Sequence, residues 1–164
     1  MYEEALALKA LCDSYDVPLI INDRVDVALA VGAAGVHVGQ DDLPCAVVRA
    51  LTGADFVIGV SAHNPEEARL AIAAGADYLG CGAVFGTATK PGVAKLGLAN
   101  LQAIRSVATI PMVGIGGVKA ENYAEVLATG ADGAAIISGI LGADDIKAEV
   151  SKFVNIKNAS GISK

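Results

Sequence analysis

Apolar residues in this chain fall into short, nearly continuous runs that alternate with segments of helical periodicity. Six of these runs predict strands, at 18–22, 36–40, 57–61, 78–83, 111–116 and 133–138. Parallel strands with both faces covered have this composition. Between the runs, glycine recurs where a helix should end, in the segments VGAAGVHVG, LTGADFVIGV, AGADYLGCG and TGADGAAII. The pattern predicts a series of repeated βα units.

The segment AHNPEEARLAIAAG gives the clearest helix prediction. Asn64 suits the N-cap, Pro65 the first helical position, and Gly75 the end of the helix. Two glutamates follow the proline, and negative charge is favourable in the first turn of a helix.

Repeated βα units fit either a doubly wound sheet or a β/α barrel. A nucleotide-binding sheet should carry G-x-G-x-x-G after its first strand, but the nearest string, GCGAVFG at 80–86, differs by one residue and lacks a helix cap. Polar residues instead recur at the carboxyl ends of successive strands, where a barrel places its active site. We therefore expect an α/β fold of the parallel β/α (TIM) barrel type.

Carboxylates follow the first two predicted strands. Asp23 comes directly after PLIIN, and Asp41 and Asp42 come directly after GVHVGQ. Neighbouring strands lie about 4.8 Å apart, so Asp23 and one of the pair should reach the same point above the sheet. Mg²⁺ is commonly held by one or two carboxylates together with substrate phosphates and water. The alternative is that these aspartates cap the helices beginning near Val25 and Pro44.

Two further strand ends suit phosphate. The loop FGTATKPG, 85–92, carries two hydroxyls and Lys90 between glycines, and a lysine there can act as a point charge for phosphate or can simply face solvent. GIGG at 114–117 and the turn after AAIIS at 134–138 would let backbone N–H groups approach a phosphate, or serve only tight packing.

Composition narrows the function classes. The chain has 164 residues, 54% of them hydrophobic, with 12 basic and 18 acidic side chains, which predicts one globular domain. A net charge of -6 without a basic cluster argues against a nucleic-acid surface. No apolar run approaches the ~20 residues of a membrane span, and MYEEALALKA is not a signal peptide. Three widely spaced cysteines predict buried thiols and, with them, a cytoplasmic location.

Taken in order and spacing, LIINDRVDVALAVGAAGVHVGQDDLP, IGVSAHNPEEA, YLGCGAVFGTATKPG and VGIGGV resemble the thiamine-phosphate synthase family. The resemblance covers residues 15–140. It implies a β/α barrel that joins hydroxymethylpyrimidine diphosphate to thiazole phosphate, giving thiamine phosphate and pyrophosphate with Mg²⁺. By this similarity Asp23 and Asp42 are metal ligands, and Ser61 and Lys90 act on the leaving pyrophosphate. The implied substrate contacts are Asn22, Ser61 and Lys90 for the pyrimidine diphosphate, and Thr87, Thr89, Gly117, Ile137 and Ser138 for the thiazole phosphate.

Two departures from the family pattern bear on activity. Gly86 stands where family members usually have proline. Family members also begin with a further strand–helix–strand segment, whose glutamine-x-arginine-x-lysine motif clamps the diphosphate, and no match to it is found here. We therefore expect a single incomplete barrel domain over 1–164, N-terminally truncated to about six strands, with 151–164 a candidate for a frayed tail. An N-terminal helix should pack Leu8, Leu11 and Cys12 inward.

Exposed strand edges in such a barrel predict self-association or a complementing N-terminal fragment, and poor activity of the chain alone. Two other functions stay open at this point. One is a thiazole tautomerase of related architecture, which the pair of carboxylates disfavours. The other is a degenerate, non-catalytic phosphate-binding fragment, which the missing clamp favours.

Overall fold

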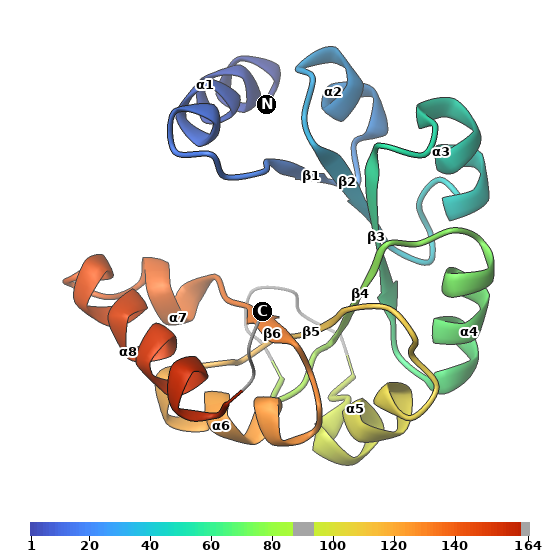
Figure 1. Ribbon diagram of the computed structural model, residues 1–164. Coiled ribbons are helices and arrows are strands. Elements are labelled where there is room, and N and C mark those ends of the chain that lie inside the picture. Colours follow the sequence, from blue (N-terminus) through green and yellow to red (C-terminus); the bar gives the residue numbers. More distant parts are fainter. Residues whose placement is uncertain (87–93, 162–164) are drawn as a thin grey trace.

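Six parallel strands form one curved sheet with helices on its outer side (Figure 1). The computed structural model describes residues 1–86 and 94–161. The strands are β1 (Ile20–Asn22), β2 (Gly35–Val38), β3 (Val57–Ala62), β4 (Tyr78–Gly82), β5 (Met112–Ile115) and β6 (Gly133–Ala135). The helices are α1 (Tyr2–Ser14), α2 (Val25–Ala30), α3 (Cys45–Thr52), α4 (Pro65–Ala73), α5 (Gly97–Arg105), α6 (Ala120–Ala128), α7 (Ser138–Leu141) and α8 (Ile146–Ala159). All six predicted strands are confirmed.

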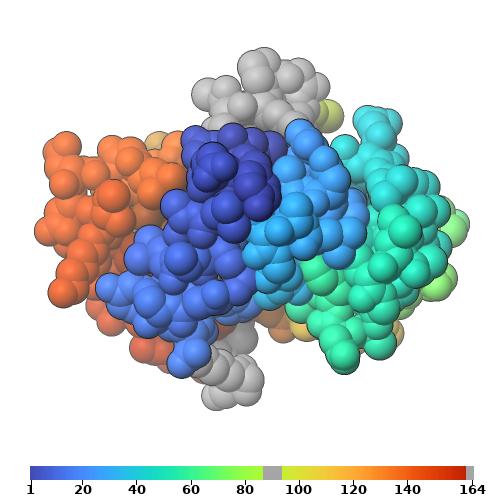
Figure 2. Space-filling model, turned by 90° about the horizontal axis from the view of Figure 1, so that it is seen from above, coloured from blue at the N-terminus to red at the C-terminus, as the bar shows by residue number. Residues whose placement is uncertain are grey.

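Sheet order follows chain order from β1 to β6, and all five pairings are parallel. Within the described part of the chain β1 and β6 do not pair with each other, so the arc stays open between α1 at one end and α7 and α8 at the other (Figure 1). Seen from above, α1, α2 and α3 follow one another along one outer surface (Figure 2). The fold is the partial β/α barrel that the sequence predicts.

The core lies between the sheet and the outer helices. Its largest fully buried side chains include Ile58, Leu79, Leu101, Ile104 and Met112. The other face of the sheet is only partly covered. In β5 the two faces therefore differ in burial, and buried and half-buried residues alternate along the strand. The expectation of strands covered on both faces is therefore wrong for the inner face, which faces a cavity.

The predicted helix after Asn64 is confirmed as α4. The Asn64 side chain accepts a hydrogen bond from the Glu67 backbone N–H at 2.9 Å, and Pro65 occupies the first turn. An unpaired N–H at the helix start is thereby satisfied, which typically stabilises a helix by about 1 kcal/mol.

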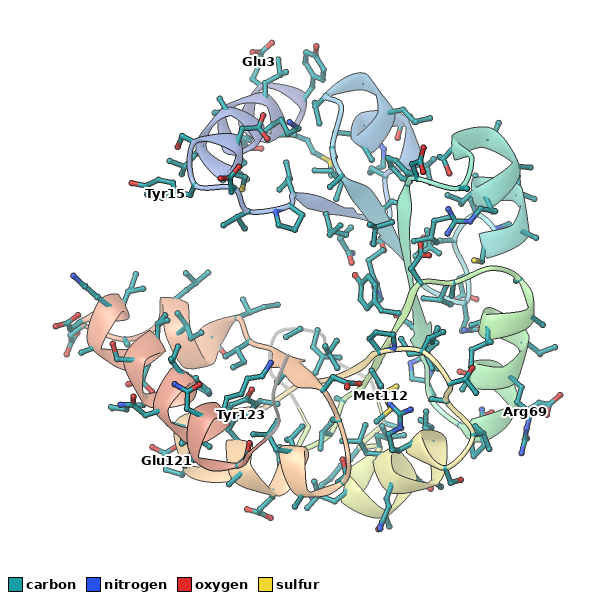
Figure 3. The ribbon with its side chains drawn as sticks, in the orientation of Figure 1. Glu3, Tyr15, Arg69, Met112, Glu121 and Tyr123 are labelled. Carbon is teal, nitrogen blue, oxygen red and sulfur yellow. The ribbon has the colours of Figure 1, made fainter. Side chains whose placement is uncertain are left out.

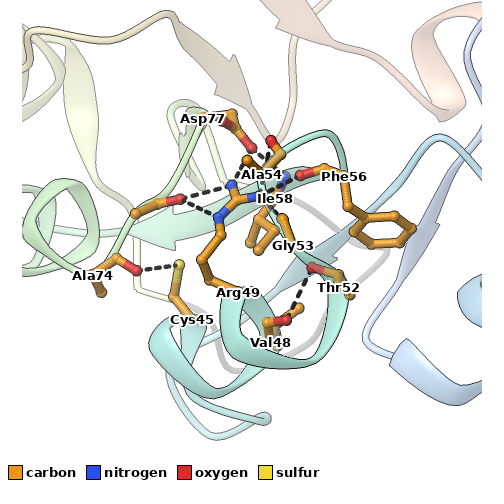
Figure 4. A network of polar contacts seen from close by, with 11 residues as sticks. Cys45, Val48, Arg49, Thr52, Gly53, Ala54, Phe56, Ile58, Ala74 and Asp77 are labelled. Carbon is orange, nitrogen blue, oxygen red and sulfur yellow. Dashed lines mark hydrogen bonds and ion pairs between the residues drawn. The ribbon is translucent and has the colours of Figure 1, made fainter.

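The repeated Gly-Ala-Asp motif ties neighbouring βα units together through its aspartate. Asp77 accepts hydrogen bonds from the backbone N–H of Ile58 at 2.7 Å and from Arg49 at 2.6 Å (Figure 4). Arg49 also donates to the carbonyls of Gly53, Phe56 and Gly75. One arginine at the end of α3 thus holds the loop before β3 and the turn before β4.

The same arrangement recurs two units later along the chain. Asp132 accepts hydrogen bonds from the backbone N–H of Met112 at 2.8 Å and from Arg105 at 3.3 Å. Arg105 also donates to the carbonyl oxygens of Ala108 and Ile110. The contact is therefore made by two of the Gly-Ala-Asp motifs, those that end at Asp77 and Asp132.

The two terminal helices differ from expectation. In α1 Ala5 is buried, whereas Leu8 and Leu11 are about half exposed at 49% and 55%, so their predicted inward packing is wrong. The stretch expected to fray beyond residue 151 is helical to Ala159.

The C-terminal helix α8 packs on α6. Tyr123 of α6 contacts Phe153 of α8 with ring centroids 5.3 Å apart. Glu3 and Arg69, by contrast, point away from the sheet (Figure 3).

Candidate active site

A cavity of about 670 Å³ lies against the inner face of the sheet and is lined by residues from all six strands. The predicted site residues that line it are Asn22, Ser61, Gly117, Ile137 and Ser138. Much of the remaining wall is apolar, formed by residues such as Ile20, Val113 and Ile115. The structure therefore brings together residues that the sequence places more than 100 positions apart.

Both predicted metal ligands lie at the carboxyl ends of adjacent strands. Asp23 follows β1, and its backbone N–H donates to the His37 carbonyl of β2 at 2.7 Å. One oxygen of Asp42 accepts the backbone N–H of Gly39, which directly follows β2, at 2.7 Å. Two carboxylates at neighbouring strand ends are a donor set that suits Mg²⁺.

The alternative role of the aspartates as helix caps is not supported. The N-cap residue of α2 is Arg24 and that of α3 is Pro44, and neither forms a side-chain cap. The carboxylate of Asp42 instead closes the turn after β2.

Gly117 occupies a position that only glycine fits. Its φ is 67°, and a Cβ there would lie 2.3 Å from the Gly86 carbonyl oxygen. The backbone at Gly117, just after β5, therefore packs directly against the backbone of Gly86, which follows β4.

A row of three polar side chains crosses the inner face of the sheet. His37 of β2 lies 3.0 Å from the hydroxyl of Tyr78 through Nδ1 and 3.0 Å from the hydroxyl of Ser61 through Nε2. All three side chains are half-buried and line the cavity. Of these three residues only Ser61 is predicted from the sequence, and His37 and Tyr78 are not.

Glycines make room for this row. A Cβ on Gly59 would lie 2.1 Å from Tyr78 Cζ and 2.4 Å from His37 Nδ1, and one on Gly80 would lie 2.7 Å from His37 Cε1. Glycine inside a strand commonly marks such a close approach. These two strand glycines, together with the histidine in GVHV, are the signal that could have revealed the row.

Burial changes the pKa of two side chains in β4. It raises the pKa of the Tyr78 hydroxyl and raises the pKa of the Cys81 thiol to about 12. Both groups therefore hold their protons at neutral pH. Within residues 1–86 and 94–161, no group of three or more His, Cys, Asp or Glu side chains is placed to hold a metal ion.

Thr87, Thr89 and Lys90 lie outside the described residues. Gly86, which directly precedes them, has φ 80°. The proline ring fixes φ near −65°, so the family's usual proline could not adopt the backbone found here.

A parallel β/α-barrel architecture with a cavity reaching the carboxyl ends of its strands defines the class of this protein, and comparison with known proteins gives its family. The family model described as thiamine monophosphate synthase matches residues 1–140. The thiamine-phosphate synthase of Chloroflexus aurantiacus is 55% identical over 149 residues, which are 90% of this chain and 68% of that protein. The enzyme of the same name from Ruminiclostridium cellulolyticum is 49% identical, over 94% of this chain and 74% of that protein.

Solved structures agree with the sequence relatives. The thiamine phosphate pyrophosphorylase of Pyrococcus furiosus superposes with a TM-score of 0.89 at 40% identity, over 98% of this chain and 77% of that one. A 3-hexulose-6-phosphate synthase from Salmonella typhimurium, at 19% identity and a TM-score of 0.75, shares the fold alone. The chain belongs to the thiamine-phosphate synthase family, whose members are transferases. The resemblance seen in the sequence is thereby confirmed.

Proposed function

We propose that this chain makes thiamine phosphate, as the names of its relatives state for them. The sequence resemblance implies that it does so by joining hydroxymethylpyrimidine diphosphate to thiazole phosphate and releasing pyrophosphate. The observation that carries this proposal is the cavity, which gathers Asn22, Ser61, Gly117, Ile137 and Ser138 around one space. Its apolar wall suits two heterocyclic rings, and three of its polar residues, Asn22, Ser61 and Ser138, lie near the carboxyl ends of strands, where barrels bind charged groups.

The reaction needs the substrates to be held and the leaving group to be stabilised. The bond between the pyrimidine methylene and the diphosphate oxygen breaks, and the electron pair leaves with pyrophosphate. The thiazole nitrogen then donates its lone pair to that methylene, so no general base is required. We assign Ser61 to the leaving pyrophosphate together with Lys90, whose role stays a prediction from the sequence.

Asp23 and Asp42 are the proposed Mg²⁺ ligands. When bound, the ion would neutralise charge on the pyrophosphate oxygens. Asp23 has a left-handed backbone with φ 64°, which is uncommon outside glycine. Conformations of this kind concentrate at functional sites, and here it fixes the carboxylate-bearing residue directly after β1.

The part of the cavity wall that follows β5 and β6 is the proposed site of the thiazole phosphate. Gly117 follows β5, and Ile137 and Ser138 follow β6. We place Thr87 and Thr89 in the same site on the sequence resemblance alone. Asn22, at the end of β1, is assigned to the pyrimidine diphosphate.

The proposed setting is the cytoplasm. In the part of the chain that the structure describes, none of the helices has both the length and the apolar character needed to cross a bilayer. Within the described sheet β1 and β6 each have one unpaired edge, which favours self-association or a complementing segment as the partner.

Thiamine phosphate formation from the two substrates with Mg²⁺ tests the proposal directly. We expect product from the wild-type chain and at least a tenfold lower kcat for Ser61→Ala, by analogy with the loss of one oxyanion donor, about 10²–10³ in rate. Ser106→Ala, an exposed hydroxyl in the turn after α5, is the matched control. Isomerisation of the thiazole without coupling would favour a tautomerase, and binding of phosphate without either reaction would favour a non-catalytic protein.

A further inference from the structure

His63 directly follows β3, and its ring is held by the first turn of α4. Its Nδ1 lies 2.8 Å from Oε2 of Glu67, and the same oxygen accepts the backbone N–H of His63 at 2.7 Å. The other carboxylate oxygen, Oε1, accepts a hydrogen bond from Nδ2 of Asn64 at 2.7 Å. Three donors from the turn before α4 thus converge on one carboxylate.

The hydrogen bond between His63 and Glu67 has a defined direction. An ionised carboxylate only accepts hydrogen bonds, so Nδ1 of the ring must carry the hydrogen. Glu67 lies in the first turn of α4, where negative charge is favourable. In the neutral ring Nε2 is therefore an acceptor, and only protonation of the ring makes Nε2 a donor. Within residues 1–86 and 94–161, Nε2 forms no hydrogen bond of its own.

The ring of His63 borders two neighbouring cavities. It lines the main cavity two residues beyond Ser61, and it also lines a smaller cavity of about 300 Å³, which Lys95 and Asn100 help to form. The side chain is 47% exposed. Because Nδ1 is turned toward α4, the edge that carries Nε2 is the part of the ring left to meet a ligand.

The walls of both cavities favour an anion as that ligand. The described residues that line them include no aspartate or glutamate. Their ionisable side chains are His37, His63, Tyr78 and Lys95, and of these only the tyrosine cannot carry a positive charge. The carboxylate that contacts the ring of His63 is that of Glu67, on the Nδ1 side. An anionic oxygen on the Nε2 side would therefore complete the contacts of a protonated ring.

We propose that His63 is a further substrate-binding residue, which in its protonated form donates a hydrogen bond from Nε2 to an oxygen of the diphosphate. The inference rests on the proposed function, and it adds a second contact to the one assigned to Ser61 at the same strand end. Glu67 is a positioning residue, since it holds the ring without touching the substrate. Binding of the diphosphate then draws one proton from solvent onto the ring.

Nitrogen NMR of the histidine rings at about pH 8.5, above the ordinary range of histidine titration, tests the arrangement in the free protein. The chain has two histidines, and the signals lost in His63→Asn are those of His63. We expect the proton of the neutral ring on Nδ1 in the wild type, and a mixture of the two tautomers in Glu67→Gln. Glu66→Gln, an exposed neighbour in the same turn, is the matched control. A proton on Nε2 in the wild type would overturn the proposal.

Titration with pyrophosphate and Mg²⁺ at about pH 6 and about pH 8.5 tests the ligand. His63→Asn keeps a donor near the position of Nδ1 and has nothing in place of Nε2. It should weaken binding about tenfold at the lower pH, the low end of the range for a hydrogen bond to a charged group, and less than about twofold at the higher pH. His63→Gln, whose amide can take the position of Nε2, should bind more tightly than His63→Asn at about pH 6. Comparing each variant with the wild type at the same pH cancels the ionisation of pyrophosphate itself.

Equal binding by the wild type and His63→Asn at both pH values would show that the histidine serves only the start of α4. A loss of the same size at both pH values would show that the protonated ring is not the donor. Either result would overturn the inference and leave the proposed function intact. Absence of pyrophosphate binding by the wild-type chain would instead overturn the proposed function together with the inference, so the two failures are distinguishable.

Discussion

Two features of the Asp23 backbone bear on how its role can be tested. Its backbone is left-handed, and its N–H is bound to the adjacent strand at 2.7 Å. Aspartate and asparagine tolerate this conformation better than other non-glycine residues. Asparagine can therefore replace it with little backbone cost, which makes Asp23→Asn a test of charge and not of fold.

The two carboxylates should bind Mg²⁺ when pyrophosphate is also present, and should bind the metal alone only weakly. Magnesium sheds water reluctantly, and two protein carboxylates leave most of its shell to other ligands. In calorimetry, Asp23→Asn and Asp42→Asn should each weaken the binding of the pair by about tenfold or more. Asp41→Asn, an exposed neighbour, is the matched control, and equal binding by all the variants would contradict the metal assignment.

The three thiols should differ in reactivity. Cys45 and Cys81 are buried, and burial raises the pKa of both thiols, whereas Cys12 is half-buried. Because the thiolate is the reactive form, iodoacetamide at about pH 8 should modify Cys12 first. Peptide mass spectrometry follows the order, and urea-unfolded protein provides the control in which all three react. Early modification of Cys81 in the folded chain would contradict its burial.

Residues at strand ends could be predicted, but residues inside strands could not. Asn22, Ser61 and Ser138 were found because polar side chains stand out where an apolar run stops. His37 lies between two valines, and Tyr78 begins a strand in which an aromatic residue is ordinary. The contact between these two side chains depends on strand register, which places His37 opposite Gly59. Register is a property of the assembled sheet and cannot be read from one strand.

At the scale of elements, local signals predicted both α4 and the N-terminal helix α1, but not the face of α1 that packs inward. The start of α4 depends on a cap and a proline within its own sequence. Inward packing of α1 depends on a surface for Leu8 and Leu11 to contact, and the described residues leave both half exposed. The Gly-Ala-Asp repeat was visible in the sequence, but its aspartate acts on the preceding strand, which no local pattern reveals.

The arginine that joins two units should be a strong determinant of stability. Arg49 is 22% exposed and satisfies several carbonyls besides Asp77 (Figure 4). Arg49→Ala should lower the free energy of unfolding by about 2–3 kcal/mol, because partly buried acceptors lose a charged donor. Urea denaturation measures the change.

Arg69→Ala is the matched control for that experiment. Among the described residues Arg69 forms one exposed pair, with Glu66 at 3.6 Å, and exposed pairs of this kind contribute about 0–1 kcal/mol. Equal losses for Arg49→Ala and Arg69→Ala would show that the carbonyl contacts contribute little. Arg105→Ala should resemble Arg49→Ala, since it repeats the same contacts.

At the scale of the molecule, the sheet is an open arc. The accessible surface is 9152 Å², whereas a compact monomer of this mass exposes about 7,500 Å². The difference of about 1,600 Å² is about twice the ~800 Å² that each partner buries in a standard interface between two proteins. Exposed apolar residues lie near both ends of the arc, Val17 just before β1 and Leu141 in α7 after β6.

Self-association should therefore be concentration-dependent and should involve the ends of the arc. Val17→Lys and Leu141→Lys place charge on exposed apolar positions there, which should shift sedimentation toward the monomer. Leu70→Lys is the matched control, because Leu70 is equally exposed at 61% but lies on α4 in the middle of the arc. An equal shift in the control, or a monomeric wild type at all concentrations, would contradict this prediction.

The rate of thiamine phosphate formation should also depend on the open side of the sheet, between β1 and β6. Fusing a strand–helix–strand segment of a family relative ahead of Met1 should raise the rate of thiamine phosphate formation well above that of the chain alone, since paired edges enclose the cavity. The same segment with its arginine and lysine replaced by alanine is the control for cationic contacts. Equal turnover with and without the segment would show that enclosure is not limiting.

The coincidence of sheet order with chain order also bears on how the molecule folds. In the described sheet every strand pairs with the strands that immediately precede and follow it along the chain. Each βα unit can therefore dock on the unit before it as it leaves the ribosome, without waiting for a distant partner. A closed barrel must also join its last strand to its first, the contact most remote in sequence. The open arc needs no such step, so, as in solenoid proteins, unfolding can begin at one end while hydrogen exchange stays slow at the other.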